Sequence, residues 1–239
     1  MGPVDTGLST GLRDVARPVS MAGERLLSVR EPLGTLLPEP GLRRGAVVVV
    51  SGSTSLVLAL VAEATTGGSW CAAAGLGSLG LVAAAELGVA LERLVLVSST
   101  DRALWPTVAA TLLDAFDIVL ARPPRHLRAA DARRLAARAR ERGAVLIVSG
   151  GEWPERADVR LTVTRNEWHG LGEGHGRLRG RRVEVVTGGR GAAARERLVA
   201  LWLPAADGGI SLADALADSV DEEPIGGVMA PPIALSTAG

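Results

Sequence analysis

The chain has 239 residues, of which 47% are hydrophobic and 22% are charged. This length and composition suit one globular domain that buries a sizeable core, and they exclude a disordered or fibrous chain. Basic and acidic side chains balance at 26 each, so any attraction for nucleic acid or an acidic substrate must come from local clusters of charge.

Several residue types are missing, and their absence excludes particular chemistries. The chain contains no Lys, no Tyr and no Gln. Without Lys it can form no Schiff base and supply no phosphate-binding P-loop lysine, and without Tyr it has no phenolic acid or base. Cys71 is the single cysteine and lies in an apolar run, so we expect a buried structural thiol rather than a disulfide or a metal ligand.

The N-terminal part, residues 1–40, is predicted to be an arm followed by a short helix. Residues 1–19 mix Gly, Pro, Ser and charges without periodicity, and they lack the basic and apolar segments of a signal peptide. A helical pattern runs from Met21 to Leu37, where prolines end it. No window of about 18 apolar residues free of Gly, Pro or charge occurs, so we expect a cytoplasmic protein with no membrane segment.

Residues 41–204 are predicted to form an α/β core in which strands and helices alternate. Apolar strands that are flanked by helices indicate a mostly parallel sheet covered on both faces. The expected strands are Ala46–Val50, Ser69–Ala74, Leu94–Val97, Asp117–Ala121 and Ala144–Val148. The expected helices between them are Leu56–Thr65, Leu79–Leu87, Ala103–Ala115 and Ala129–Arg142.

The pattern changes after Gly150. Three strands with polar alternation and Gly-rich connections follow, which predicts antiparallel strands at an edge of the sheet. They are Val159–Thr164, Arg182–Thr187 and Leu198–Leu203. Two histidines, His169 and His175, lie in the Gly-rich connection, but without a third ligand they indicate a flexible hairpin rather than a metal site.

Residues 205–239 are predicted to be an acidic, partly disordered tail. They include no basic residue and six acidic ones, which are Asp207, Asp214, Asp218, Asp221, Glu222 and Glu223. One short helix is expected from Ser211 to Val220. Leu212, Leu216 and Val220 would form its apolar face and dock into a groove on a basic partner.

The first core strand leads into a short loop, Ser51-Gly52-Ser53-Thr54-Ser55, and then into a helix. A nucleotide-binding α/β protein places its phosphate loop at this point. The loop is too short for a P-loop and has no Lys, so Ser53 and Thr54 are better explained as helix N-caps. A hydrolase nucleophile at Ser53 is not favoured, because the Gly-x-Ser-x-Gly turn is absent. We therefore expect no cofactor, no metal and no catalytic residue.

The order of segments resembles the core of RecA-type recombinases, from Gly41-Leu42-Arg43-Arg44-Gly45 to about residue 203. In that family Leu56-Val57-Leu58 would follow the phosphate loop directly, so a stretch containing Gly-Lys-Thr looks deleted here. The resemblance places a catalytic Glu after Ala73-Ala74 and a magnesium-binding Asp after Ile118-Val119-Leu120, but the chain has Gly75 and Ala121-Arg122. The DNA-binding loops also look shortened, to residues 123–126 and 150–154.

A RecA-like core that lacks its ATPase motifs is similar to the ImuA-type (ImuA′-like) accessory proteins of bacterial mutagenic translesion synthesis, in the Arg-rich form typical of actinobacteria. The resemblance implies a non-catalytic adaptor in the DNA-damage (SOS) response. It would bridge a Y-family-like polymerase homologue of the ImuB type and an error-prone C-family polymerase, with RecA as a further partner. The alternative is a RecA-like cell-division inhibitor of the SulA type, and a divergent ATPase is disfavoured by the missing lysine and acids.

Two surfaces are candidates for contact. Arg125 and Arg128, with Arg133, Arg134 and Arg138 on the following helix, form the strongest basic cluster in the sequence. They could hold DNA weakly and without sequence preference, or they could simply be a solvated helix face. The apolar Leu26, Leu27 and Leu33 are expected to have too little neighbouring chain to bury them, and the resemblance implies that a recombinase-like partner covers them.

Overall fold

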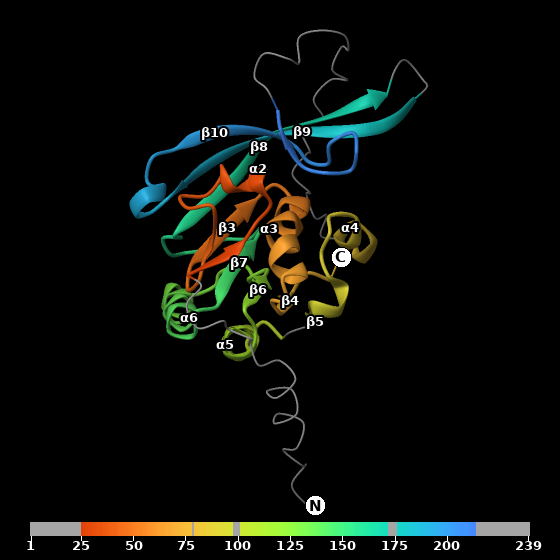
Figure 1. Cartoon of the computed structure of the whole chain (residues 1–239). Coiled ribbons are helices and arrows are strands. Elements are labelled where there is room, and N and C mark those ends of the chain that lie inside the picture. Colours follow the sequence, from red (N-terminus) through yellow and green to blue (C-terminus); the bar gives the residue numbers. More distant parts are fainter. Residues whose placement is uncertain (1–24, 78, 98–100, 172–175, 214–239) are drawn as a thin grey trace, which may run out of the picture.

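The computed structural model describes residues 25–77, 79–97, 101–171 and 176–213 (Figure 1). Its strands are β1 (Leu26–Ser28), β2 (Gly41–Arg43), β3 (Val47–Ser51), β4 (Cys71–Ala74), β5 (Leu94–Val97), β6 (Ile118–Ala121), β7 (Val145–Ser149), β8 (Val159–Leu171), β9 (Gly176–Gly189), β10 (Arg197–Trp202) and β11 (Ser211–Leu212). Its α-helices are α2 (Glu31–Gly34), α3 (Thr54–Thr66), α4 (Leu81–Glu86), α5 (Trp105–Ala115) and α6 (Ala129–Arg142), and its 3₁₀ helices are η1 (Leu91–Arg93) and η2 (Gly191–Ala193).

Nine of the described strands form one mixed sheet, in the order β11-β10-β9-β8-β3-β7-β6-β4-β5. Strands β8, β3, β7, β6, β4 and β5 are parallel to one another. Strands β9, β10 and β11 add antiparallel pairs at one edge. The predicted α/β fold, mostly parallel with antiparallel strands in the C-terminal part, is therefore confirmed.

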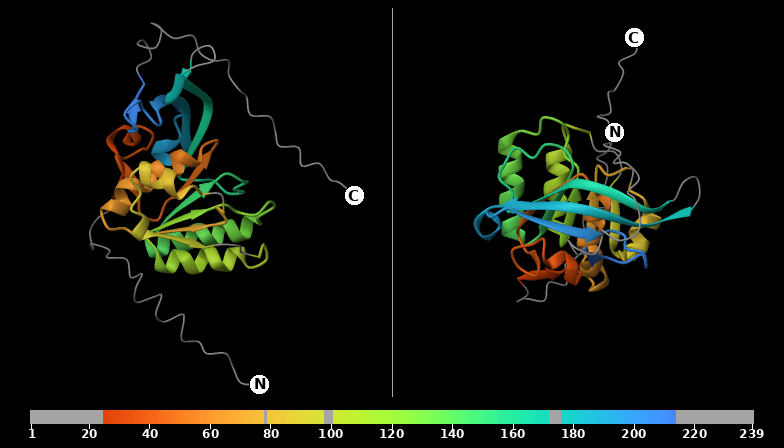
Figure 2. Two further views of the ribbon diagram at one scale, coloured as in Figure 1. Left: turned by 90° about the vertical axis from the view of Figure 1, so that its right-hand side faces the viewer. Right: turned by 90° about the horizontal axis from the view of Figure 1, so that it is seen from above.

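Helices cover both faces of the parallel part of the sheet, as Figure 2 shows. On β3, Val48 and Val50 pack in the core under α3, whereas Val47 and Val49 pack in the core under α5 and α6. Successive side chains of a strand point to opposite faces, so a strand buried on both sides is apolar at every position. This is the reason that the central strands were recognisable as uninterrupted apolar runs.

The N-terminal segment differs from its prediction. No helix spans Met21 to Leu37 in the described residues, because Leu26–Ser28 forms strand β1 and pairs antiparallel with β2, and only the four residues of α2 are helical. Leu27 and Leu33 are buried in the core beside α3, and Leu26 is half-buried. The premise that these leucines lack neighbours within the chain is thus wrong for Leu27 and Leu33.

The C-terminal part of the sheet continues past Pro204. The predicted helix from Ser211 is wrong at its start, because Ser211–Leu212 is strand β11 and pairs with β10. Leu212 is 49% exposed, and Ala213 after it is buried. Leu216 and Val220, the other two predicted contact residues of the tail, lie outside the described residues.

Two further expectations concern single residues and membrane spans. Cys71 is fully buried on β4, and desolvation, with a smaller contribution from the charge of Asp117, raises the pKa of its thiol. A thiol with a raised pKa holds little reactive thiolate, as expected of a structural cysteine. Among the described helices, none has the length and apolar character needed to cross a membrane.

Candidate functional site

The turn between β3 and α3 is the position of the degenerate phosphate loop. Gly52 has φ +86°, in the left-handed region that glycine adopts readily. A Cβ at Gly52 would lie 2.9 Å from the carbonyl oxygen of Val163 on β8. The turn is therefore tight and pressed against the neighbouring strand, and its backbone does not form a wide loop around a ligand.

The hydroxyl groups of the turn are used within the protein. The Oγ of Ser53 accepts a hydrogen bond from the backbone N–H of Leu56 at 3.2 Å, which makes Ser53 the N-cap of α3 as predicted. Thr54 is the first residue of the helix rather than a second cap. The Oγ atoms of Ser53 and Ser55 are 3.0 Å apart and share a further hydrogen bond.

An arginine from a distant strand lies over this helix N-terminus. Arg181, on β9, donates from Nη2 to the Oγ of Ser55 and, at 3.4 Å, to the Oγ of Ser53. Its Nε donates to the carbonyl oxygen of Leu203 at 2.7 Å. The guanidinium carbon is also 5.4 Å from the centre of the Trp168 ring, within the range of a cation–π contact. Partial burial lowers the pKa of Arg181.

Arg181 places a positive charge beside the α3 N-terminus, where a P-loop would use its own lysine and its backbone N–H groups for phosphate. The serine hydroxyls that remain in the turn are bound to this arginine and to each other. A cavity of about 740 Å³ adjoins them, lined by charges of both signs and by Trp168. Its charged lining residues are Arg30, Glu86, Arg181 and Asp207. The arrangement suits internal packing of charge better than the binding of a triphosphate.

The strand ends that carry the acids of an ATPase are also occupied by other residues. Strand β4 ends in Ala74 and is followed by Gly75, and β6 ends in Ala121 followed by Arg122. The Nε of Arg122 donates to the carbonyl oxygen of Ser149 at 3.3 Å, so this arginine links the ends of β6 and β7. No carboxylate stands at either position to hold magnesium or to activate water.

Four of the five arginines of the basic helix α6 form ion pairs. Arg133 pairs with Glu155 at 2.9 Å, and Arg134 pairs with Asp131. Arg138 donates twice to Asp114 on α5, from Nε at 2.5 Å and from Nη2 at 2.7 Å. Leu135, Ala136 and Ala139 are buried on the opposite side of α6, as the solvated-face interpretation expects. These pairs reduce the charge that α6 could offer to DNA.

The remaining candidates of the basic cluster lie before α6. Arg125 and Arg128 are exposed on the connection from β6, and they line a hollow of about 390 Å³ together with Arg102, Arg134 and Asp131. Their interaction with DNA stays a prediction.

Asp114 is expected to make part of the stability depend on pH. Partial burial raises the pKa of this carboxyl, but the hydrogen bond and charge of Arg138, with Arg142 beside it, outweigh burial and hold the pKa below its ordinary value of 3.8. A lowered pKa stabilises the fold above the unfolded value and loses that contribution as pH falls through the folded value. Exposed pairs contribute about 0.2–1 kcal/mol.

The corresponding measurement compares the native protein with Asp114→Asn in urea titrations from pH 7 to pH 2. We expect the native protein to be more stable at pH 7 and the two to converge below pH 3.8. A difference that stays constant over this range would show that the charge of Asp114 does not contribute.

Two tryptophans and two histidines are further side chains that could contact a base, a partner or a metal. Trp153 is buried in the core beside α6, which is an ordinary packing role. Trp168 lies on β8 and is 41% exposed. His169, also on β8, contacts the Trp202 ring edge-on at 4.8 Å, and His175 is outside the described residues. Within the described ranges, no group of three or more His, Cys, Asp or Glu side chains could hold a metal ion.

The fold is similar to that of a solved recombinase structure. A crystal structure of the RadB recombinase superposes with a TM-score of 0.55 at 17% sequence identity, covering 79% of this chain and all of that one. At this identity the likeness concerns the fold alone. The chain therefore has a RecA-like fold, in which the phosphate-loop position is a short turn under Arg181.

The family follows from sequence comparison. Residues 35–155 match the family described as the MT3502 N-terminal domain, and this chain belongs to that family. The uncharacterized protein Rv3395c of Mycobacterium tuberculosis is 36% identical over 146 residues, which are 59% of this chain and 71% of that protein.

Proposed function

We propose that this chain is a non-catalytic RecA-like adaptor of the ImuA type, which acts by contact in DNA-damage-induced mutagenic translesion synthesis. The observation that carries the non-catalytic part is Arg181, which lies across the turn where a RecA-type ATPase binds phosphate. The same role is favoured by the apolar or arginine residues at the ends of β4 and β6. The adaptor part rests on the resemblance of the segment order to ImuA-type proteins.

The β5 edge of the sheet, with exposed apolar residues on the segments before and after it, is the part of the fold that we propose for contact with a partner. Among the described strands, β5 pairs only with β4, and Leu96 on it is 46% exposed. Val82 on α4, the helix that precedes β5 in the chain, is 73% exposed, and Leu104, just before α5, is 57% exposed. Exposed apolar side chains beside an open strand edge are typical of protein-binding surfaces. We assign this surface to a Y-family-like polymerase homologue of the ImuB type.

Capture of that polymerase homologue by the purified full chain tests the proposal. We expect a stable complex, and we expect Leu96→Asp or Val82→Asp to weaken it at least about tenfold, because a charge in an apolar interface loses its hydration. Leu198→Asp is the matched control, because Leu198 is 63% exposed on β10, in the antiparallel part of the sheet away from β5. Capture of a tubulin-like division polymer in place of the polymerase homologue would contradict the proposal.

Nucleotide binding gives a second and independent readout. Calorimetry with ATP and magnesium is expected to give no heat of binding, because the turn offers few N–H donors and Arg181 is bound to Ser53 and Ser55. Arg181→Ala is expected to give no heat either, since removing the arginine does not supply a P-loop lysine. Micromolar binding by the native chain, or hydrolysis that Ser53→Ala or Thr54→Ala abolishes, would contradict the non-catalytic role.

A further inference from the structure

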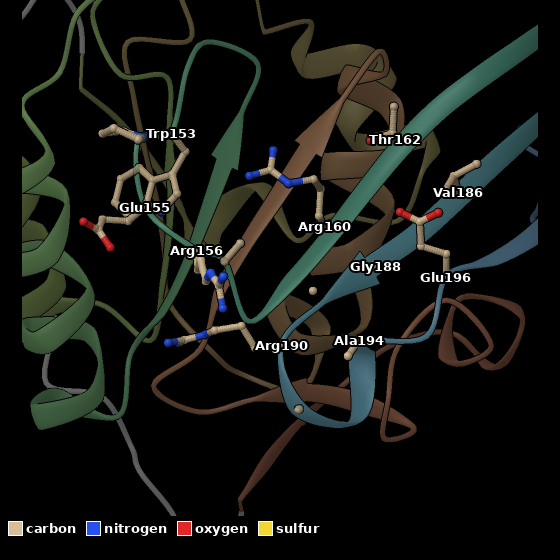
Figure 3. Close-up of a pocket in the computed structure, with 14 residues that line it drawn as sticks. Trp153, Glu155, Arg156, Arg160, Thr162, Val186, Gly188, Arg190, Ala194 and Glu196 are labelled. Carbon is tan, nitrogen blue, oxygen red and sulfur yellow. The ribbon is translucent and has the colours of Figure 1, made fainter.

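A groove of about 690 Å³ lies on the face of β8 and β9 that is opposite α3 (Figure 3). Arg160, Thr162 and Val186 form part of its floor, while the neighbouring residues Leu161 and Val185 point into the core. The connection between β7 and β8 forms one wall. Because α6 covers β3, β6 and β7 but not this hairpin, the groove is open to solvent.

Arginines line this groove from three segments. Figure 3 shows Arg160 on β8, Arg156 on the β7–β8 connection and Arg190 after β9. Arg190 pairs with Asp158 at 2.7 Å. Arg156 and Arg160 are exposed, and within the described part of the chain neither makes an ion pair or a hydrogen bond from its side chain.

Two carboxylates also line the groove. Glu155 is bound to Arg133 of α6, and Glu196 faces the groove from the start of β10. Because Glu155 and Arg190 are paired, the groove keeps Arg156 and Arg160 as available cations and Glu196 as one carboxylate, which leaves it net positive.

The charge of the chain is divided between this hairpin region and the tail. Residues 156–202 contain ten arginines and five acidic residues, whereas residues 214–239 contain five acidic residues and no basic one. The zero net charge of the chain therefore combines a net positive charge in residues 156–202 with an equal net negative charge in residues 214–239. Opposite charges joined by a short tether meet at a high effective concentration.

Strand β11 runs in the direction of the groove. The N–H of Ala213 donates to the carbonyl oxygen of Ala200 at 3.0 Å, and β11 runs antiparallel to β10. Strand β11 therefore runs along β10 in the direction of Arg197, the first residue of β10, which follows Glu196 of the groove.

The length of the segment is sufficient to reach the arginines. Asp218 to Glu223 follow Ala213 by five to ten residues, which span up to about 17–33 Å. Reaching Arg160 from Ala213 requires about 13 Å along β10 and, from β11 to β8, three strand spacings of about 4.8 Å across the sheet.

We propose that the acidic segment Asp218–Glu223 of this chain occupies the groove and pairs with Arg156 and Arg160. The groove is thus an acidic-peptide site whose resident ligand is the protein's own C-terminal segment. This inference does not rest on the proposed function, and neither polymerase capture nor nucleotide binding bears on it.

A spin label on the full chain tests the contact. A nitroxide attached at Ser219→Cys leaves the buried Cys71 unlabelled, and amide signals near the label lose intensity in an ¹⁵N correlation spectrum. We expect the amides of residues 188–194 to lose about half of their intensity or more at low salt and to recover at 1 M salt, where the Debye length is about 3 Å. The amides of α4 serve as the distant reference.

Charge variants identify the groups. Replacing Asp218, Asp221, Glu222 and Glu223 by their amides, or Arg156 and Arg160 by Ala, is expected to restore the intensity of these signals. Arg102→Ala with Arg128→Ala is the matched control, which removes the same charge from the hollow before α6 and should leave the loss unchanged.

Four outcomes would overturn the proposal. The first is no loss of intensity at low salt, and the second is a loss that persists after Arg156 and Arg160 are replaced. The third is a loss that appears only when spin-labelled protein is mixed with a separate ¹⁵N-labelled copy, which would mean contact between two molecules. The fourth is binding of a single-stranded oligonucleotide in the groove while the spin label stays distant.

Discussion

Replacing Asp117 by Ala is expected to lower the free energy of unfolding by about 3–5 kcal/mol, the range found when one partner of a buried ion pair is removed. Asp117 is 3% exposed and precedes β6. One carboxylate oxygen accepts a hydrogen bond from Nη1 of Arg44 at 2.9 Å, and the other accepts from the backbone N–H of Trp70 at 3.1 Å. The variant leaves both donors without this acceptor, and Arg44 keeps a charge that is largely out of water.

The large expected loss of stability follows from the position of Asp117, which links the N-terminal ends of three strands. Arg44 comes just before β3 and Trp70 just before β4, so the carboxylate joins the entrances of three strands. Nε of Arg44 is buried and has no hydrogen-bond partner among the described residues, so this guanidinium depends on its bond to Asp117. The backbone carbonyl of Asp117 also accepts from Val145 N–H at 2.8 Å, and that bond remains in the variant.

Chemical denaturation of a small series measures this prediction. Asp117→Asn keeps the shape and one acceptor and should cost less than Asp117→Ala. Arg44→Met combined with Asp117→Ala should cost clearly less than the sum of the two single changes, because the double variant leaves no unpaired charge. Glu152→Ala, at an exposed position, is the control. A cost for Asp117→Ala no larger than that of the control would mean that the pair is not formed in solution.

The central part of the fold could be predicted from the sequence because its signals are local. Helix α6 and strand β5 have the predicted bounds, Ala129–Arg142 and Leu94–Val97. The amphipathic period identifies α6, and the short uninterrupted apolar run identifies β5, although Leu96 on this edge strand is 46% exposed. The N-terminal segment was mispredicted because three leucines within a short stretch fit a helical period as well as a strand followed by one helical turn.

The candidate site shows the limit of local reasoning more clearly. The loss of the P-loop lysine is a local fact, and Ser53 as N-cap followed from its position before an apolar helix. Arg181 lies 126 residues after Ser55, and its sequence context is that of an ordinary strand with alternating charges. Its contact with the turn depends on the pairing of β8 with both β3 and β9, which the sequence pattern does not specify. The basic helix α6 likewise looked like an open cluster because its partners Asp114 and Glu155 come from other segments.

The burial of the N-terminal segment leads to the last prediction: Leu33→Ala is expected to lower the free energy of unfolding by about 2–5 kcal/mol. Leu33 is fully buried in α2 and packs in the same core as Leu36 and Leu42, so the shorter side chain leaves a cavity that its neighbours fill only in part. Leu104→Ala, at a position that is 57% exposed, should change stability by less than about 0.5 kcal/mol. Urea unfolding of both variants measures these differences, and we expect the slope of the free energy of unfolding against urea concentration to stay unchanged. Equal stability of the two variants would mean that α2 is not part of the folding unit, and that a partner protein rather than this chain covers Leu33.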